Sequence, residues 1–275
     1  MNRKTPASTA GKAIGVVVLI SLSLFPFYWM LSTAVDTSPL SRGASLLPSG
    51  FTLEHFRYVL VDAGFLRYVR VSVIVAVGTV VLSAIVALLA AVAVARFRFR
   101  LRTQVLIMVL MVQMVPLEAL VIPLFLQARN LNMLNSLLGL IIVYVGFSLA
   151  FAIWNLRGFV AAVPRELEEA AYIDGATWFR MFRSVLLPLV APGLVATSVF
   201  SFITAWNEFI FALTFMQDSA KYTVGVGLRT FFTQNTADWG SVMAASTIIT
   251  LPVVIFFVLV QRNLAQGMTA GAVKG

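Results

Sequence analysis

Residues 71–95 read VSVIVAVGTVVLSAIVALLAAVAVA, a run that contains no charged side chain. A helix of about 20 residues, rising about 1.5 Å per residue, crosses a bilayer core about 30 Å thick. This run is therefore long enough and apolar enough to form a membrane-spanning helix. The whole chain has the same character, because 60% of its 275 residues are hydrophobic and only 11% are charged. Such a composition excludes an ordinary soluble enzyme and a disordered or fibrous protein.

Five other segments of similar length carry at most one charged residue each. They are 13–33, 103–128, 130–156, 184–215 and 239–261. Backbone groups in lipid must satisfy their own hydrogen bonds, and segments of this length favour helices over the strands of about ten residues that build a barrel. We therefore predict an all-α polytopic membrane protein with six transmembrane helices. Its parts would be a terminus at 1–12, a membrane domain at 13–262 and a tail at 263–275.

The distribution of Lys and Arg predicts the orientation of these spans. Thirteen of the 20 fall on one side, in the N-terminal segment, the turn at 96–102, the loop at 157–183 and the C-terminal segment. The positive-inside rule then places both termini in the cytoplasm, and the net charge of +9 needs no nucleic acid to explain it. The basic turn at 96–102 could also meet lipid headgroups or nucleic acid, but the membrane topology is enough to account for it.

Residues 1–34 resemble a signal peptide in outline, yet Pro26 and the lack of a small-x-small cleavage site favour a retained span.

Few catalytic chemistries are open to this chain. It has no cysteine and one histidine, which excludes thiolate metal sites, disulfides and cysteine nucleophiles and leaves little imidazole chemistry. It contains neither an HExxH metal motif nor a GxxxxGK[ST] phosphate loop. We therefore predict no catalytic residue, no metal site and no cofactor bound by this chain, and nothing marks it as an ATPase.

The loop at about 157–188 is patterned rather than passive. Pro164 can start a helix, the acidic side chains at 166–169 suit its positive end, and Gly175 can end it. Ala170 and Ala171 remove side-chain bulk from this helix, so it could lie deep in the cleft of a partner protein. The alternative is an interfacial helix that rests on its own bundle or on lipid headgroups.

A second short helix is predicted directly after Gly175. Its apolar side chains recur at i, i+3, i+4 and i+7, and they are Trp178, Met181, Phe182 and Val185. This spacing places them on one helix face, which needs a surface to pack against.

These residues resemble a known motif. Glu169-Ala170-Ala171, three residues, Gly175, nine residues and then Val185-Leu186-Leu187-Pro188 is similar to EAA(x3)G(x9)IxLP, the EAA loop of bacterial ATP-binding-cassette importer permeases. Val185 in place of Ile is the one departure. The Trp206-Asn207-Glu208-Phe209 segment and the ending at 268–275 also resemble the maltose-type carbohydrate-uptake permeases, so the similarity covers essentially the whole chain.

The resemblance implies a partner for each task. This chain would be one permease half in the bacterial inner membrane, working with a second homologous permease, two ATPase subunits that use ATP and Mg, and an extracellular or lipid-anchored solute-binding protein. The sugar, whether mono-, di- or oligosaccharide, is left open.

The resemblance also implies roles for individual residues. Residues 169–184 would be coupling helices in a groove of the ATPase, with Glu169 meeting a basic residue and Gly175 making the bend. The motif residues expected to carry this coupling are Glu169, Ala170, Ala171, Gly175, Leu187 and Pro188, and those expected to pack at the interface are Trp178, Met181 and Phe182. The tail at 269–275 would reach the ATPase or be a frayed end. The loop at 217–238 would contact the docked binding protein or simply cover the outer mouth.

Two carboxylates lie inside predicted spans. Each of them, Glu118 and Glu208, would cost about 3 kcal/mol at the bilayer centre if it faced lipid. We expect a polar substrate pathway built from Gln113, Glu118, Trp206, Asn207 and Glu208. The alternative is that each carboxylate pairs with a partner subunit or caps a helix end near the outer surface.

An ion-coupled secondary transporter could also use Glu118 and Glu208, but six spans are few for such a transporter, and an EAA loop would have no role in it.

Overall fold

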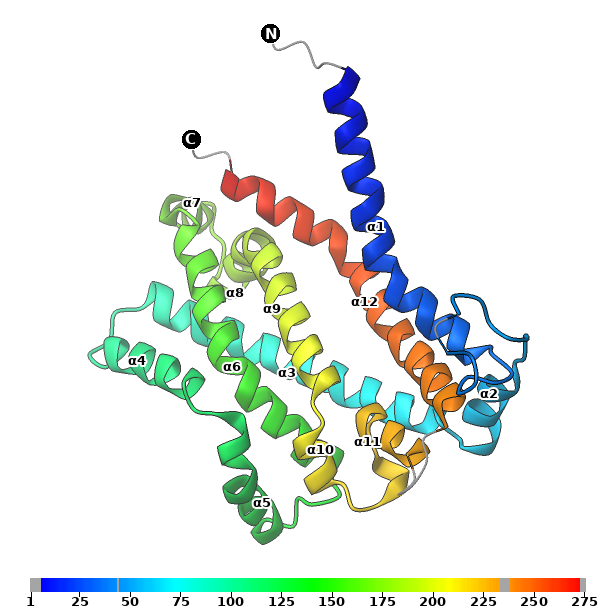
Figure 1. The fold of residues 1–275 in the computed structure, drawn as a ribbon. Coiled ribbons are helices and arrows are strands. Elements are labelled where there is room, and N and C mark those ends of the chain that lie inside the picture. Colours follow the sequence, from blue (N-terminus) through cyan, green and yellow to red (C-terminus); the bar gives the residue numbers. More distant parts are fainter. Residues whose placement is uncertain (1–5, 44, 233–237, 273–275) are drawn as a thin grey trace. The chain divides into compact units, whose positions relative to one another are not determined.

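The computed structural model describes residues 6–43, 45–232 and 238–272, and this part of the chain is built from helices (Figure 1). The chain divides into two compact units, residues 1–66 with 228–251 and residues 67–227 with 252–275. Helix α12 (Trp239–Ala272) contributes its first part to one unit and the rest to the other.

The first unit contains α1 (Pro6–Ala34), α2 (Glu54–Arg57), the π-helical turn η1 (Tyr58–Asp62), η5 (Arg229–Phe231) and the start of α12. The ring of Phe231 lies 5.7 Å from that of Phe65 and 6.3 Å from that of Tyr58, which joins η5 to the segment that follows α2. The apolar residues of α1 are exposed along most of its length, so this helix offers its surface to lipid or to a partner.

The second unit holds the remaining helices. They are α3 (Leu66–Arg96), α4 (Arg102–Gln113), η2 (Leu117–Leu120), α5 (Val121–Asn130), α6 (Leu137–Ala162), α7 (Arg165–Ile173), α8 (Trp178–Met181), η3 (Phe182–Leu186), α9 (Leu187–Asn207), α10 (Ile210–Phe215), η4 (Ser219–Lys221) and α11 (Val224–Leu228).

Helices α3, α6 and α9 form the packed centre of this unit. Phe151 of α6 stacks on Phe200 of α9 at 3.9 Å, and Gly193 lets α9 approach α6 closely, because a Cβ there would lie 2.4 Å from the Phe159 ring. Ser83 of α3 donates a hydrogen bond of 3.1 Å to Ser201 of α9. Close packing and a buried hydrogen bond therefore hold the three helices together.

The expected helical membrane spans are confirmed in type, and in number they are five or six within the described part of the chain, depending on whether one bent pair counts as a span. In the described residues five continuous helices are long and apolar enough to cross a membrane, and a sixth span would be a pair, 102–113 and 117–130, bent by 96°. Pro116 and Pro123 predict a kink in this span, and the structure instead has a complete break after Gln113. Pro116 is extended at the break and has no N–H to continue a helix.

Two other predicted spans were wrong in their bounds. The fourth was expected from residue 130, but α6 begins at Leu137, because Asn132 and Asn135 take left-handed backbone angles and the Ser136 side chain caps the helix. The fifth was expected to run unbroken to residue 215, but α9 ends at Asn207 and α10 follows after an extended Glu208.

The ends of the chain lie partly outside the described residues. Helix α12 continues to Ala272, through most of the segment predicted as the tail. Residues 1–5 and 273–275, which include Arg3, Lys4 and Lys274 of the orientation argument, are not described, and neither is 233–237 of the loop expected near the binding protein.

Candidate functional site

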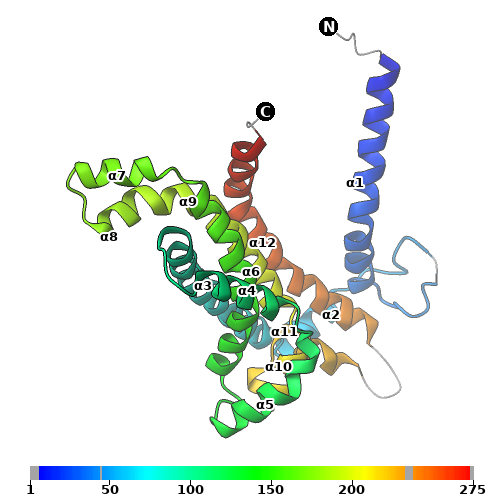
Figure 2. The same cartoon turned by 90° about the vertical axis from the view of Figure 1, so that its left-hand side faces the viewer.

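The segment at 164–188 forms a helical hairpin, in which α7 lies beside α8 and η3 (Figure 2). Helix α7 starts directly after the extended Pro164, as predicted. Its end is closed by two backbone hydrogen bonds, from Gly175 N to Tyr172 O at 3.0 Å and from Ala176 N to Ala171 O at 2.9 Å. This is a Schellman closure, which needs a left-handed residue, and Gly175 supplies it with φ of +79°. We call residues 164–188 the 164–188 hairpin.

The second arm of this hairpin differs from the prediction of a separate short helix. Thr177 caps α8, and the backbone then stays helical through η3 into α9, so that one helix runs from Trp178 to Asn207. The wide π-helical turn of η3 ends at Leu186, two residues before Pro188, which lacks an N–H for the normal helical hydrogen bonds. Any movement of the second arm is therefore passed directly to a membrane span.

The motif residues of the hairpin have different surroundings. Glu169, Ala170, Gly175 and Pro188 are exposed, while Ala171 and Leu187 are partly buried. The apolar face singled out in the sequence is split. Trp178 is exposed and stacks on Phe182 at 5.4 Å, but Met181 is only 3% exposed.

Met181 lies in a core formed by this chain itself. It belongs with Leu186 of η3 to a buried cluster with residues of α3 and α6, among them Val92 and Leu156. Its side chain therefore packs inside this chain and presents almost no surface to a partner in this structure.

Two apolar side chains of the hairpin that sequence reasoning passed over are strongly exposed. Ile173 is 87% exposed at the end of α7, and Phe179 is 64% exposed on α8. Phe179 lies off the i, i+3, i+4 spacing that drew attention to its neighbours, so the periodicity gave no signal for it.

A pocket of about 250 Å³ lies between the hairpin and the end of α3. Arg96, Glu168, Glu169, Tyr172, Trp178 and Met181 are among its lining residues. The Arg96 Nε and Glu168 Oε1 atoms form an ion pair at 2.6 Å. The pocket thus combines aromatic walls with a charge pair that the hairpin and α3 make together.

The candidate pathway residues lie at the two helix breaks of the second unit. Gln113 and Glu118 flank the break between α4 and α5, and both are exposed. Asn207 and Glu208 lie at the break between α9 and α10, where Asn207 is exposed. Backbone at a break cannot face lipid, so both breaks need protein or water beside them. Trp206 is buried and stacks on Phe202 at 5.5 Å, which points to packing.

Glu208 makes three hydrogen bonds within this chain. Its carboxylate accepts from the backbone N–H of Phe211 at 2.8 Å, from the N–H of Ala212 at 3.1 Å and from the Tyr144 hydroxyl at 2.5 Å. The first two satisfy free donors at the start of α10. The arrangement matches the capping alternative raised for this carboxylate.

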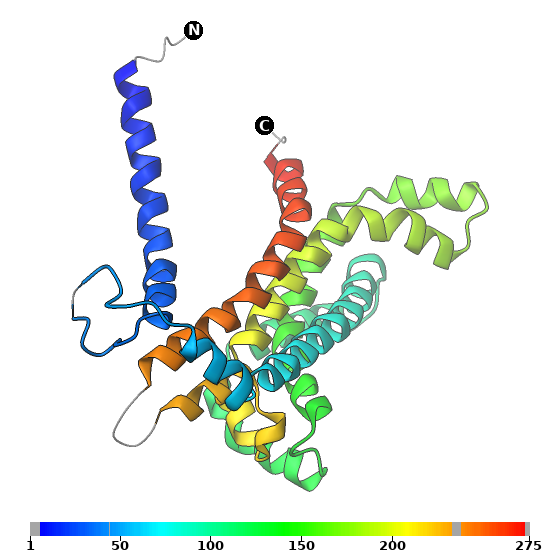
Figure 3. The same ribbon diagram turned by 90° about the vertical axis from the view of Figure 1, so that its right-hand side faces the viewer.

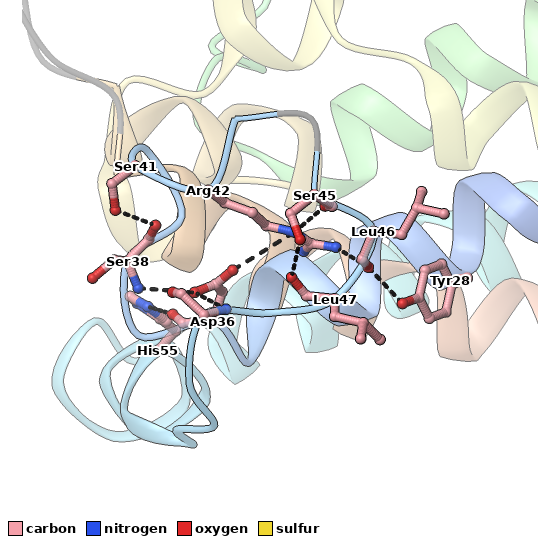
Figure 4. A network of polar contacts seen from close by, with 10 residues as sticks. Tyr28, Asp36, Ser38, Ser41, Arg42, Ser45, Leu46, Leu47 and His55 are labelled. Carbon is pink, nitrogen blue, oxygen red and sulfur yellow. Dashed lines mark hydrogen bonds and ion pairs between the residues drawn. The ribbon is translucent and has the colours of Figure 1, made fainter.

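In the first unit, the loop between α1 and α2 is held by a buried polar network that the sequence did not reveal (Figure 4). The carboxylate of Asp36 accepts hydrogen bonds from the backbone N–H groups of Ser38 and Ser49 and from the Ser49 hydroxyl. Arg42 lies 3.8 Å from this carboxylate, covers the Trp29 ring and donates to the carbonyl oxygens of Ser45 and Leu46.

The pKa of Asp36 reflects this network. Burial is the largest influence and would raise the pKa, but the hydrogen bonds from Ser49 and Ser38 and the charge of Arg42 outweigh it and hold the pKa below its ordinary value of 3.8.

We therefore expect the loop at 35–53 to lose protection in acid. Because the folded pKa of Asp36 lies below the unfolded one, its stabilisation is complete above about pH 4 and is lost as the pH falls through the folded pKa. Amide hydrogen exchange of the loop between pH 7 and pH 3 would measure this. Asp36→Asn should remove the pH dependence and lower protection already at pH 7. Equal protection of the wild-type loop at every pH would contradict the prediction.

Residues 80–270 match the family described as the binding-protein-dependent transport system inner membrane component. The chain belongs to this family. Over 262 residues it is 44% identical to the diacetylchitobiose uptake system permease protein DasC of Streptomyces coelicolor, covering 94% of this chain and 95% of that protein. It is 38% identical to the trehalose/maltose transport system permease protein MalG of Thermococcus litoralis, with 95% of each chain covered.

The fold also matches a solved structure, that of a bacterial ABC transporter involved in the import of the acidic polysaccharide alginate. The TM-score is 0.81 at 22% identity, covering 95% of this chain and 99% of the other. At this identity the match supports the fold alone.

Membership confirms the resemblance found in the sequence. The permease is a multi-pass inner-membrane component of a binding-protein-dependent transport system, which implies a complex with a partner permease, an ATPase and a solute-binding protein. It also favours this function over an ion-coupled secondary transporter.

Proposed function

We propose that this permease is one half of the membrane channel of an ATP-driven importer that carries a sugar. The observation that carries the proposal is the 164–188 hairpin, which displays the EAA residues Glu169 and Ala170 on an exposed helix and continues directly into a span. The sugar class rests on the relatives, whose names give diacetylchitobiose for DasC and trehalose and maltose for MalG. Because these sugars differ between the relatives, the sugar carried by this importer has to be identified from what its binding protein binds.

The complete importer would contain this permease, a homologous second permease, two ATPase subunits and an extracellular or lipid-anchored binding protein. ATP and Mg would be used by the ATPase subunits, and this chain would bind no cofactor, metal or nucleic acid of its own. The excess of Lys and Arg on the side of the 164–188 hairpin supports a cytoplasmic position for the hairpin and both termini. The contacts of the tail at 269–275 stay a prediction.

Reconstitution in proteoliposomes with the ATPase and the binding protein tests this function. We expect sugar uptake to require ATP on the side of the membrane where the ATPase is bound. Uptake should persist when ionophores collapse the ion gradients. A panel of mono-, di- and oligosaccharides bound by the cognate binding protein would identify the substrate. Uptake that continues without ATP and stops with the ionophore would establish the ion-coupled alternative instead.

Docking of the ATPase would use exposed residues of the hairpin. Glu169 is exposed on α7, where small Ala170 permits close approach of a partner, and Ile173, Trp178 and Phe179 are exposed apolar residues of the same hairpin. We propose that Glu169 meets a basic residue in the ATPase groove and that these apolar side chains form the rest of the contact. Met181 would support this surface from within the permease core.

Reversal of the Glu169 charge should weaken docking. In Glu169→Lys, two positive charges would meet in the groove, and losing a closely paired interfacial charge costs about 2–5 kcal/mol, which corresponds to a loss of affinity of about thirtyfold or more. Copurification of the ATPase and ATP-dependent uptake would both measure it. Glu166→Lys makes the same charge change at an exposed position of α7 and should behave like wild type. Equal losses in both variants would mean that general charge, and not a contact of Glu169, controls docking.

The sugar pathway would run along the two breaks in the spans. Gln113, Glu118 and Asn207 are the exposed polar groups there, and water at these breaks would satisfy both the free backbone and a passing sugar. Glu208 would fix the shape of the second break through its hydrogen bonds to Tyr144 and to the backbone of α10.

A further inference from the structure

Helix α3, cyan in Figure 3, runs toward the 164–188 hairpin. It ends at Arg96, which lines the pocket between α3 and the hairpin. The Arg96 guanidinium forms the ion pair with Glu168 at 2.6 Å and donates from Nη2 to the carbonyl oxygen of Val163 at 2.9 Å. In return, Arg165 donates from Nη2 to the carbonyl oxygen of Arg96 at 3.3 Å. Three polar contacts therefore join the last residue of α3 to the start of α7.

The charge pair is largely shielded from water. The side chains of Arg96 and Glu168 are 11% and 12% exposed. Exposed ion pairs contribute little, but removing one partner of a covered pair leaves the other charge without compensation. The contact should thus be kept while the hairpin moves as a rigid unit.

Two neighbouring glutamates of α7 have different surroundings and, we infer, different roles. Glu169 is exposed and available to a partner, whereas Glu168 is turned toward α3. The motif resemblance covers Glu169 and assigns nothing to Glu168 or Arg96.

The contacts of Arg96 connect the hairpin to α3, a span that does not adjoin the hairpin in the sequence. Helices α6 and α9 flank the hairpin in sequence, so they follow it through covalent connection. Helix α3 is about 70 residues away in sequence and has only noncovalent contacts. Val92 and Ala95 of α3 share an apolar cluster with Met181 and Leu186 of the hairpin, and the ion pair adds a charged contact at the end of α3.

We propose that Arg96 and Glu168 form a latch that makes α3 follow the movements of α7 during transport. This proposal rests on the proposed function, because it needs an ATPase that moves the hairpin. Arg96 and Glu168 are positioning residues here, since neither is placed against sugar or ATP.

The test uses the complete importer in proteoliposomes and measures sugar imported per ATP hydrolysed. Arg96→Gln and Glu168→Gln should keep copurification of the ATPase but lower this ratio about fivefold or more, the lower end of typical coupling effects. The exchange Arg96→Glu with Glu168→Arg should restore a large part of the ratio, because it re-forms a pair with opposite polarity. Arg98→Gln and Glu166→Gln neutralise exposed neighbours and should keep the wild-type ratio.

The measured ratio and the copurification together distinguish a latch from a pair that only maintains the docking surface. A wild-type ratio in both neutral variants would overturn the latch while ATP-dependent uptake by wild type still supports the proposed function. Loss of ATPase copurification without rescue by the exchange would also overturn it, because the pair would then only maintain the docking surface. If the neutral variants fail to insert, Arg96→Lys and Glu168→Asp keep both charges but shift their contact. A lowered ratio in these variants supports the latch, and a wild-type ratio refutes it.

Discussion

Gly175→Val should abolish ATP-dependent uptake while leaving membrane insertion intact. The Schellman closure of α7 needs the φ of +79° at this residue. A left-handed conformation costs an L-residue about 1–2 kcal/mol, and a β-branched side chain tolerates it least. The end of α7 would therefore change its path, and the two arms of the 164–188 hairpin would no longer present Glu169 and Phe179 together. Uptake and copurification of the ATPase would measure the effect.

A second substitution at the same position separates backbone conformation from side-chain size. Asparagine tolerates the left-handed region, so Gly175→Asn should retain much of the uptake that the valine variant loses. A Cβ at Gly175 meets no atom of this chain within 4 Å, so crowding inside the permease is not the cause. If Asn fails as severely as Val, the ATPase must approach too closely for any side chain. Normal uptake and normal copurification in the Val variant would refute the docking role of Gly175.

The features that sequence predicted well depend on local chemistry. Six apolar runs follow from the thickness of a bilayer, and the start and end of α7 follow from Pro164 and Gly175, whose effects act within a few residues. The kink near Pro116 was predictable for the same reason. Its extent, a bend of 96°, was not, because the angle depends on what packs beside each half.

The features that sequence missed depend on distant contacts. Periodicity showed that Met181 lies on an apolar face, but it could not show that α3 and α6, rather than a partner, cover it. The pairing of Arg96 with Glu168 and of Tyr144 with Glu208 joins residues more than 60 positions apart. Only the capping of α10 left a local signal, since Glu208 precedes Phe211 by three residues, a spacing at which a side chain can accept from a free backbone N–H.

Glu208→Ala should slow the uptake of every sugar by a similar factor. The substitution removes the acceptor for two N–H groups of α10 and for the buried hydroxyl of Tyr144, and each buried polar group left unsatisfied costs about 1–3 kcal/mol. The break between α9 and α10 would lose its fixed shape, so the maximal rate should fall more than tenfold. Tyr144→Phe removes one of the three bonds and should have a smaller effect in the same direction.

Uptake kinetics across a panel of sugars distinguish this structural role from direct contact with the substrate. A carboxylate that only caps α10 should lower the maximal rate for all sugars alike, with little change in the ratio of their KM values. A carboxylate that binds sugar hydroxyls should instead raise KM most for the sugars that it contacts, and Tyr144→Phe should not reproduce that pattern. Because the three hydrogen bonds occupy the carboxylate within this chain, we expect the uniform loss. A changed sugar preference in Glu208→Ala, with Tyr144→Phe unaffected, would show that Glu208 lines the pathway.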